Sequence, residues 1–182
     1  QFLQQHHVDI SCVTAQAQQT GQVLVQLDDQ GCASYEFASD TAWDNLAWSR
    51  DLEQLAARTD IVCYGTLGQR SLPSCETIQR FVSVTPPAAI RIFDINVRPP
   101  FVSDSLILDS LSLANVLKMN DDELPVVASL CQLSGSEFEL MRQLAERYSL
   151  QAVALTRGPE GALLIRGDES SQQAGVPTDV AD

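Results

Sequence analysis

The sequence lacks several features that would assign it to a class at once. No apolar stretch approaches the roughly 18 residues needed to span a bilayer, and the N-terminal residues have neither the basic start nor the apolar core of a signal peptide. Basic residues are few, because 11 lysines and arginines stand against 24 aspartates and glutamates, for a formal net charge of -13. Such a surface repels polyanions, so we expect neither a nucleic acid nor a membrane as partner.

The common catalytic signatures are also missing. The sequence contains no G-x-x-x-x-G-K-[ST], G-x-G-x-x-G, H-E-x-x-H or G-x-S-x-G, so P-loop kinases, Rossmann dehydrogenases, zincins and α/β-hydrolases have no support. None of the five cysteines forms a C-x-x-C pair, which argues against zinc ribbons and thioredoxin-like sites. Scattered cysteines of this kind suit a reducing compartment, so we expect a cytoplasmic protein.

The composition is that of a globular domain, with 45% hydrophobic and 19% charged residues. From residue 50 onward, apolar runs alternate with segments of helical spacing. We expect strands over 60–65, 88–94, 115–119, 151–156 and 162–166, and helices over 51–58, 71–84, 103–113, 121–130 and 137–148. This alternation predicts an α/β protein with a mainly parallel sheet between helices.

The first 40 residues have a different pattern. Residues 20–27 alternate apolar and polar, 28–31 supply turn chemistry, and 33–37 resume a strand, so we expect a hairpin separate from the sheet. We also expect a short strand over 8–13. The polar run 169–173 is expected to be a surface loop.

Polar residues follow three of the predicted strands, where ligands bind in open α/β sheets. Asp94, Asn96 and Arg98 follow the strand 88–94 and point the same way if the strand continues. A carboxylate, an amide and a guanidinium on one side can position a polyhydroxy or phosphorylated ligand. The alternative is a structural salt bridge at a strand end.

Asn120 and Glu123 follow the strand 115–119. Asn120 is a good helix N-cap, and Glu123 three residues later completes a capping box in all but residue type. The alternative is functional, because an amide and a carboxylate beside a helix N-terminus can help hold a hydrated Mg²⁺.

Thr156, Arg157, Gly158 and Gly161 follow the strand 151–156. Glycines let backbone amides approach a phosphate closely, and the threonine adds a hydroxyl. A turn of this composition also joins two strands with no ligand at all.

The order of these motifs resembles ATP-dependent carbohydrate kinases of the ribokinase (PfkB) family. Asp94-x-Asn96-x-Arg98, Asn120-x-x-Glu123 and Thr156-x-Gly158-x-x-Gly161 occur in the family's succession, and the ending 175–182 resembles the approach to its D-T-x-G-A-G-D signature. The resemblance spans nearly the whole chain and is strongest to fructokinase-type members.

The resemblance implies a three-layer α/β/α sandwich with a β-hairpin lid. Residues 1–182 would be a partial kinase domain, with lid strands over about 18–38 and an α/β core over about 50–182. The family's N-terminal sugar-binding part and its C-terminal G-A-G-D part would lie outside the sequence. The lid forms dimer contacts in many relatives, which implies a homodimer.

The same resemblance assigns roles to residues. Asp94, Asn96 and Arg98 would contact substrate or phosphate, whereas Asn120 and Glu123 would support Mg²⁺ through water. Thr156, Arg157, Gly158 and Gly161 would line the ATP site, and Asp182 would lie at a site for a monovalent cation, usually K⁺. The catalytic base would follow Asp182, so these residues include no catalytic one.

The implied reaction transfers the γ-phosphoryl group of Mg-ATP to a sugar hydroxyl, with a fructokinase-like acceptor. Ribokinase and 2-keto-3-deoxygluconate kinase are alternatives. A further alternative is a non-catalytic relative that binds sugar or nucleotide.

Overall fold

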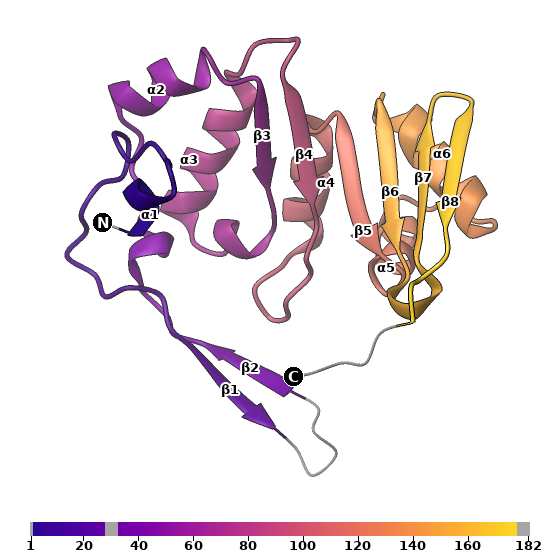
Figure 1. The fold of residues 1–182 in the computed structure, drawn as a ribbon, viewed down its shortest axis with the longest axis horizontal. Coiled ribbons are helices and arrows are strands. Elements are labelled where there is room, and N and C mark those ends of the chain that lie inside the picture. Colours follow the sequence, from indigo (N-terminus) through magenta and orange to yellow (C-terminus); the bar gives the residue numbers. More distant parts are fainter. Residues whose placement is uncertain (1, 28–32, 178–182) are drawn as a thin grey trace. The chain divides into compact units, whose positions relative to one another are not determined.

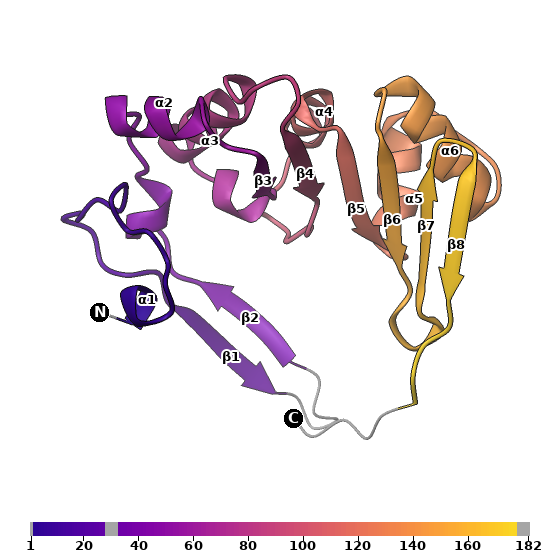
Figure 2. The same ribbon diagram turned by 45° about the horizontal axis from the view of Figure 1, so that its top comes forward.

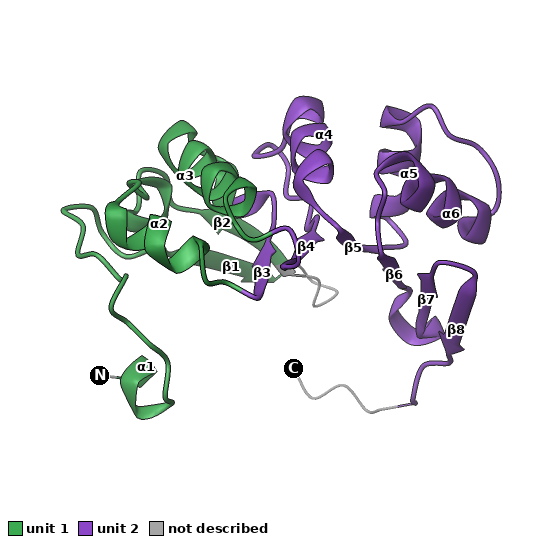
Figure 3. Ribbon diagram, turned by 90° about the horizontal axis from the view of Figure 1, so that it is seen from above, with its two compact units in different colours: residues 1–59, 68–86 green, residues 60–67, 87–182 purple. Residues whose placement is uncertain are grey.

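The structure is a computed structural model, which describes residues 2–27 and 33–177 (Figure 1). The chain forms two compact units, shown in different colours in Figure 3. Unit 1 comprises residues 1–59 and 68–86, and unit 2 comprises residues 60–67 and 87–182.

Unit 2 is built on a six-stranded sheet whose strands are neighbours in chain order. The strands are β3 (Ile61–Tyr64), β4 (Ile90–Asp94), β5 (Val116–Asn120), β6 (Ala152–Thr156), β7 (Ala162–Arg166) and β8 (Glu169–Gln173). β3 to β6 are parallel, whereas β7 and β8 are antiparallel to their neighbours. The predicted α/β class with a mainly parallel sheet is confirmed.

The helices of unit 2 are α4 (Asp104–Leu113), α5 (Glu123–Leu130) and α6 (Glu137–Arg147). All three lie on one face of the sheet, as Figures 1 and 3 show from two directions. This arrangement follows from topology, because right-handed crossovers between consecutive parallel strands place their helices on the same side. Local capping fixes where they begin: the Ser103 hydroxyl accepts from the Leu106 amide at 3.2 Å.

The two faces of this sheet differ in exposure. Tyr64, Phe93, Leu117, Val153 and Ile165 form one row across five strands on the helix side, and all are buried. The opposite face, called the open face, carries both aliphatic and polar side chains and remains partly exposed. Its side chains include Ile61, Ile90 and Leu164, which are 60%, 38% and 49% exposed.

Unit 1 contains the short α1 (Phe2–Gln5), a hairpin of β1 (Val23–Leu27) and β2 (Ala33–Phe37), and the helices α2 (Arg50–Ala56) and α3 (Leu72–Ser83). Two 3-10 turns, η1 (Ala42–Asp44) and η2 (Leu67–Gln69), accompany them. Pro73 lies in the first turn of α3, where the missing N–H of proline costs no helical hydrogen bond. The predicted hairpin is confirmed.

The two strands of the hairpin lie side by side in Figure 2. One face of this hairpin is apolar and largely exposed. The antiparallel register pairs Val23 with Phe37 and Val25 with Tyr35, so these four side chains share a face. Val25 and Tyr35 are 56% and 57% exposed. A two-stranded ribbon has no second layer of its own to cover such a face.

A buried ion pair joins two segments of unit 1. Arg70 donates from Nε to Asp44 Oδ1 and from Nη2 to Asp44 Oδ2, both at 2.6 Å. The backbone N–H and the hydroxyl of Thr41 each donate to Asp44 Oδ2 at 2.9 Å. These bonds, led by those from Arg70, lower the pKa of Asp44 to about 2. The guanidinium also lies over the Trp43 ring, 4.9 Å from its centroid.

Two sequence expectations are wrong. Residues 8–13 form no strand, since they pair with no other strand in the described part of the chain. The polar run 169–173 is not a loop but β8, because its backbone pairs with β7 across a two-residue turn at Gly167 and Asp168. The turn expected at 28–31 lies outside the described residues. Within the described part, no helix is long and apolar enough to cross a membrane.

Candidate functional site at the strand ends of unit 2

The candidate site lies where β4, β5 and β6 end. The parallel register pairs Asp94 with Lys118 and Asn120 with Thr156, so these four residues lie at the same edge of the sheet. Alternation along each strand places them on the open face, opposite the buried row of Phe93, Leu117 and Val153. Residues predicted from three separate motifs are therefore brought to one edge.

Glu123 links two strand ends. Its Oε2 accepts from the Asn120 amide at 2.9 Å, while Asn120 Oδ1 accepts from the Glu123 amide at 2.8 Å, which makes a reciprocal capping box. The other oxygen, Oε1, accepts from the Val97 amide at 2.9 Å. Glu123 is 4% exposed. The pairing of Asn120 with Glu123 was predicted, but α5 begins at Glu123 and not at 121, so Asp122 and not Asn120 holds its N-cap position. The bond to Val97 was not predicted.

The geometry of Glu123 bears on the expected Mg²⁺. Each carboxylate oxygen already accepts one backbone N–H, so each keeps a lone pair for one further donor, such as a water. Such a carboxylate fits a role through water better than direct coordination, because Mg²⁺ keeps most of its waters. Among the described residues, no three histidine, cysteine or acidic side chains group closely enough to hold a metal ion. Asp182 lies outside the described residues.

The segment after Asp94 does not continue as a strand. β4 ends at Asp94, and Asn96 has a left-handed φ of 50°, so Asp94, Asn96 and Arg98 do not form one straight row. The buried Thr66 hydroxyl donates to the carbonyls of Ile95 and Asn96, at 2.8 and 3.0 Å, and holds this bend. Arg98 is exposed, and its Nη1 donates to the Val97 carbonyl at 3.0 Å.

Gly65 explains why the loop at 65–66 approaches this bend so closely. A Cβ at Gly65 would lie 2.6 Å from the Asp94 carbonyl oxygen, closer than such atoms normally come. Only glycine therefore lets the chain after β3 pass the end of β4.

Thr156, Arg157, Gly158 and Gly161 form a compact turn. The Arg157 amide donates to the Gly161 carbonyl at 2.8 Å, and the Gly161 amide donates to the Gly158 carbonyl at 3.1 Å. Gly158 and Gly161 have φ of 49° and 93°. Packing explains the second glycine, because a Cβ there would overlap the Gln173 carbonyl oxygen. The Thr156 carbonyl accepts from the Asp121 amide at 3.1 Å, which ties this turn to the end of β5.

Lys118 was not singled out from the sequence. Its Nζ lies 3.0 Å from Asp94 Oδ1, and both side chains are more than a third exposed. The nearby Cys63 thiol, on β3, has a raised pKa, chiefly because of burial and also because of the Asp94 carboxylate. The sequence could have indicated this position, because Lys118 lies between the apolar Leu117 and Met119 of β5 and must therefore project from the face away from the helices.

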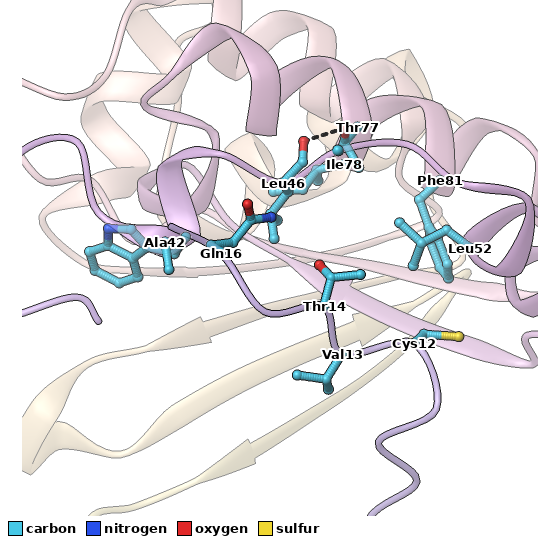
Figure 4. Close-up of a pocket in the computed structure, with 12 residues that line it drawn as sticks. Cys12, Val13, Thr14, Gln16, Ala42, Leu46, Leu52, Thr77, Ile78 and Phe81 are labelled. Atoms are coloured by element: carbon cyan, nitrogen blue, oxygen red, sulfur yellow. Dashed lines mark hydrogen bonds between the residues drawn. The ribbon is translucent and has the colours of Figure 1, made fainter. Parts of the chain in front are cut away.

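Unit 1 contains an apolar pocket of about 360 Å³ (Figure 4). Its walls include Val13, Leu46, Leu52, Ile78 and Phe81, and none of its lining residues is charged. The Thr77 hydroxyl donates to the Leu46 carbonyl at 2.8 Å at its edge. The pocket contains none of the predicted site residues, and it lacks the convergent polar groups that a sugar or a phosphate needs.

Comparisons with known proteins agree on one family. The model of the pfkB family carbohydrate kinases matches residues 1–182. A fructokinase of Salmonella typhimurium is 31% identical over 169 residues, which cover 88% of this chain and 53% of that protein. The chain therefore spans about half the length of this curated relative.

Solved structures share the fold. A fructokinase from Xylella fastidiosa with bound ATP superposes with a TM-score of 0.82 at 20% identity, covering 99% of this chain and 57% of that one. An aminoimidazole riboside kinase from Salmonella enterica, complexed with aminoimidazole riboside and an ATP analog, superposes with a TM-score of 0.74 at 20% identity. That match covers 100% of this chain and 59% of the kinase.

Proposed function

The chain belongs to the pfkB family of carbohydrate kinases, and from that membership we propose that the whole protein transfers the γ-phosphoryl group of ATP to a sugar hydroxyl. Fructose is the proposed acceptor, since a relative at 31% identity is a fructokinase. The observation that carries the proposal is the meeting of Asp94, Asn120 and Thr156 at one edge of the sheet. Ligands of open α/β sheets bind at this edge.

In the proposed reaction the sugar hydroxyl oxygen forms a bond to the γ-phosphorus while the bond from that phosphorus to ADP breaks. The electron pair of the broken bond leaves with ADP. The hydroxyl proton passes to a carboxylate base, which the family resemblance places after Asp182. The residues of this chain would supply positioning and charge, which account for most of the catalysis in phosphoryl transfer.

Three groups of residues would hold the reactants. Thr156, Arg157, Gly158 and Gly161 are proposed to line the nucleotide site. Asp94, Asn96 and Arg98 are proposed to contact the sugar or the transferred phosphoryl group.

Asn120 and Glu123 are proposed to orient water molecules around Mg²⁺, which when bound neutralises phosphate charge. The two backbone amides on the Glu123 carboxylate support this indirect role. Asp182 is proposed to lie at a K⁺ site.

Two other acceptors and one non-enzymatic role compete with fructose. One candidate is ribose or a riboside, because the structurally similar kinase from Salmonella enterica is complexed with aminoimidazole riboside. The other sugar candidate is 2-keto-3-deoxygluconate. A non-catalytic relative that binds sugar or nucleotide would keep Asp94, Asn120 and Thr156 at the strand ends and would lack the catalytic carboxylate.

We further propose that residues 1–182 are part of a longer kinase domain that forms a homodimer through its lid. The exposed apolar face of the hairpin, around Val25 and Tyr35, supports such a contact. We propose a cytoplasmic location, because the five cysteines of the sequence are scattered and odd in number, a usage that suits a reducing compartment.

The deciding assay measures ADP release from Mg-ATP by the full-length protein with fructose, ribose, 2-keto-3-deoxygluconate and adenosine. Turnover of one sugar that Arg98→Ala or Glu123→Ala abolishes without unfolding the protein is the expected result. ATP binding without turnover of any sugar would favour the non-catalytic relative. Absence of nucleotide binding would overturn the kinase proposal.

A further inference from the structure

Lys118 occupies an unusual place on the sheet. It projects from β5 onto the open face, where its neighbours in the same row are Asp94, Ala154 and Leu164. Its Nζ lies 3.0 Å from Asp94 Oδ1, and the two side chains are 36% and 39% exposed. Lys118 stands two residues before Asn120, which exchanges hydrogen bonds with Glu123.

Stability does not explain this ion pair. Exposed pairs contribute about 0–1 kcal/mol, and aliphatic side chains like those of Ile61 and Ile90 on the same face would serve the sheet equally well. On β3 to β6 the charged residues of this face are Asp94 and Lys118, since its other charged pair, Arg166 and Glu169, lies on β7 and β8 at the opposite end of the strands. Two charges at the end where ligands bind instead suggest a ligand of complementary charge.

We propose that Lys118 contacts the phosphoryl group during its transfer. In the absence of substrate its ammonium is neutralised by Asp94. With reactants bound, the ammonium stabilises the negative charge on the phosphoryl oxygens while the Asp94 carboxylate accepts a hydrogen bond from a hydroxyl of the sugar. This role rests on the kinase function proposed above and adds a residue to it.

The residue type supports this assignment. Lys118 is the only lysine in the sequence, and every other cation among its 11 lysines and arginines is an arginine. An ammonium is a compact point charge that suits a moving phosphoryl group, whereas a guanidinium is a planar fork that fixes its partner in two bonds. A chain that supplies cations as arginine everywhere else uses lysine at this one position.

The first test is kinetic and uses the full-length protein with the sugar that it phosphorylates. Lys118→Met should lower kcat by about 100-fold, as expected for loss of one charge that stabilises the transition state, with the KM for ATP changed far less. Lys118→Arg should recover part of that loss. The matched control is Arg142→Met, which breaks an exposed ion pair, 3.2 Å long, between α6 and Asp168 in the β7–β8 turn, at the end of the strands opposite the site, and should leave kcat unchanged.

The second test does not depend on turnover or on the stability of a variant. The wild-type protein is acylated with an amine-selective reagent, and modification of the peptide that contains Lys118 is measured by mass spectrometry. Fructose together with AMP-PNP, a non-hydrolysable ATP analogue, should slow modification of Lys118 by about 10-fold or more, as close contact with a phosphate requires.

The outcomes separate the two proposals. If the wild-type protein turns over no sugar, the kinase function itself is overturned. If the wild-type protein is active but Lys118→Met keeps its kcat within about twofold, or substrates leave the acylation rate of Lys118 unchanged, only the role of Lys118 is overturned. A loss of kcat in Lys118→Met together with protection of Lys118 by the substrates supports it.

Discussion

Two acidic residues, one in each unit, are buried for different physical reasons. Asp44 is paired with the guanidinium of Arg70 in two hydrogen bonds of 2.6 Å. Glu123 instead accepts hydrogen bonds from the backbone amides of Asn120 and Val97. Each arrangement satisfies a buried carboxylate, and each makes a different prediction about its loss.

The Asp44–Arg70 pair should make stability depend on acid. A carboxyl whose pKa is lowered to about 2 in the folded protein stabilises it fully above the unfolded pKa, and this contribution is lost as the pH falls through the folded value. The wild-type protein should therefore have a higher free energy of unfolding than Asp44→Asn at neutral pH. This difference between the two proteins should shrink by about 2 kcal/mol when the pH is lowered to about 2. Denaturant unfolding of the full-length protein across this range measures the difference. A constant difference would show that Asp44 is not the titrating group.

Glu123→Gln should destabilise the protein at neutral pH. The glutamine side chain keeps one acceptor oxygen, so the amide of either Val97 or Asn120 loses its partner, at a cost of about 1–3 kcal/mol. The control is Glu146→Gln, which changes an exposed position of α6. Chemical denaturation measures the free energy of unfolding of both variants. Equal stability of the two would contradict a stabilising role for the Glu123 carboxylate, which bonds Val97 after β4 and Asn120 at the end of β5.

The turn between β6 and β7 is shaped by its contact with the end of β8 and the residues that follow it. Gly161 packs against the backbone at Gln173, and a Cβ at Gly175 would overlap the Pro159 carbonyl. These glycines therefore have a packing role that exists whether or not a phosphate binds. The phosphate-site prediction for Thr156, Arg157, Gly158 and Gly161 stays a prediction.

Two glycine-to-alanine variants distinguish packing from backbone strain. Gly167 has φ of 56° and open space around it, so Gly167→Ala should cost about 1 kcal/mol from strain alone. Gly161→Ala adds an overlap with backbone to a φ of 93° and should cost about 3 kcal/mol or more. Thermal unfolding of the full-length variants ranks them. Equal losses would mean that the turn relaxes away from residues 173–175.

For the molecule as a whole, the apolar face of the hairpin around Val25 and Tyr35 is largely exposed. If this face forms the proposed dimer contact, Val25→Asp should convert a dimeric full-length protein into monomers, because an unpaired charge would be buried in the interface. Gln26→Asp, on the other face of the same strand, should leave the dimer intact. Sedimentation velocity distinguishes the two states. A wild-type protein that is already monomeric, or a Val25→Asp variant that stays dimeric, would exclude this interface.

The sequence predicted the features that depend on neighbouring residues. Apolar runs predicted the parallel strands, and the spacing of Asn120 and Glu123 predicted their two reciprocal hydrogen bonds. β8 was missed because its residues are polar, and its strand conformation comes from pairing with β7. The strand expected over 8–13 does not form for the converse reason: its residues favour extended backbone, but no strand among residues 2–27 and 33–177 pairs with them.

Periodicity, capping and motif order are properties of neighbouring residues, so the α/β class, the family and the residue types at each strand end could be predicted from the sequence. Which of those residues meet depends on the folded chain. The Glu123–Val97 bond joins α5 to the segment after β4, and the Lys118–Asp94 pair joins β5 to β4. The bend at Asn96 turns Arg98 out of the row that alternation had predicted. Such contacts depend on strand order and register, which the chain fixes only when its apolar face is buried beneath α4, α5 and α6.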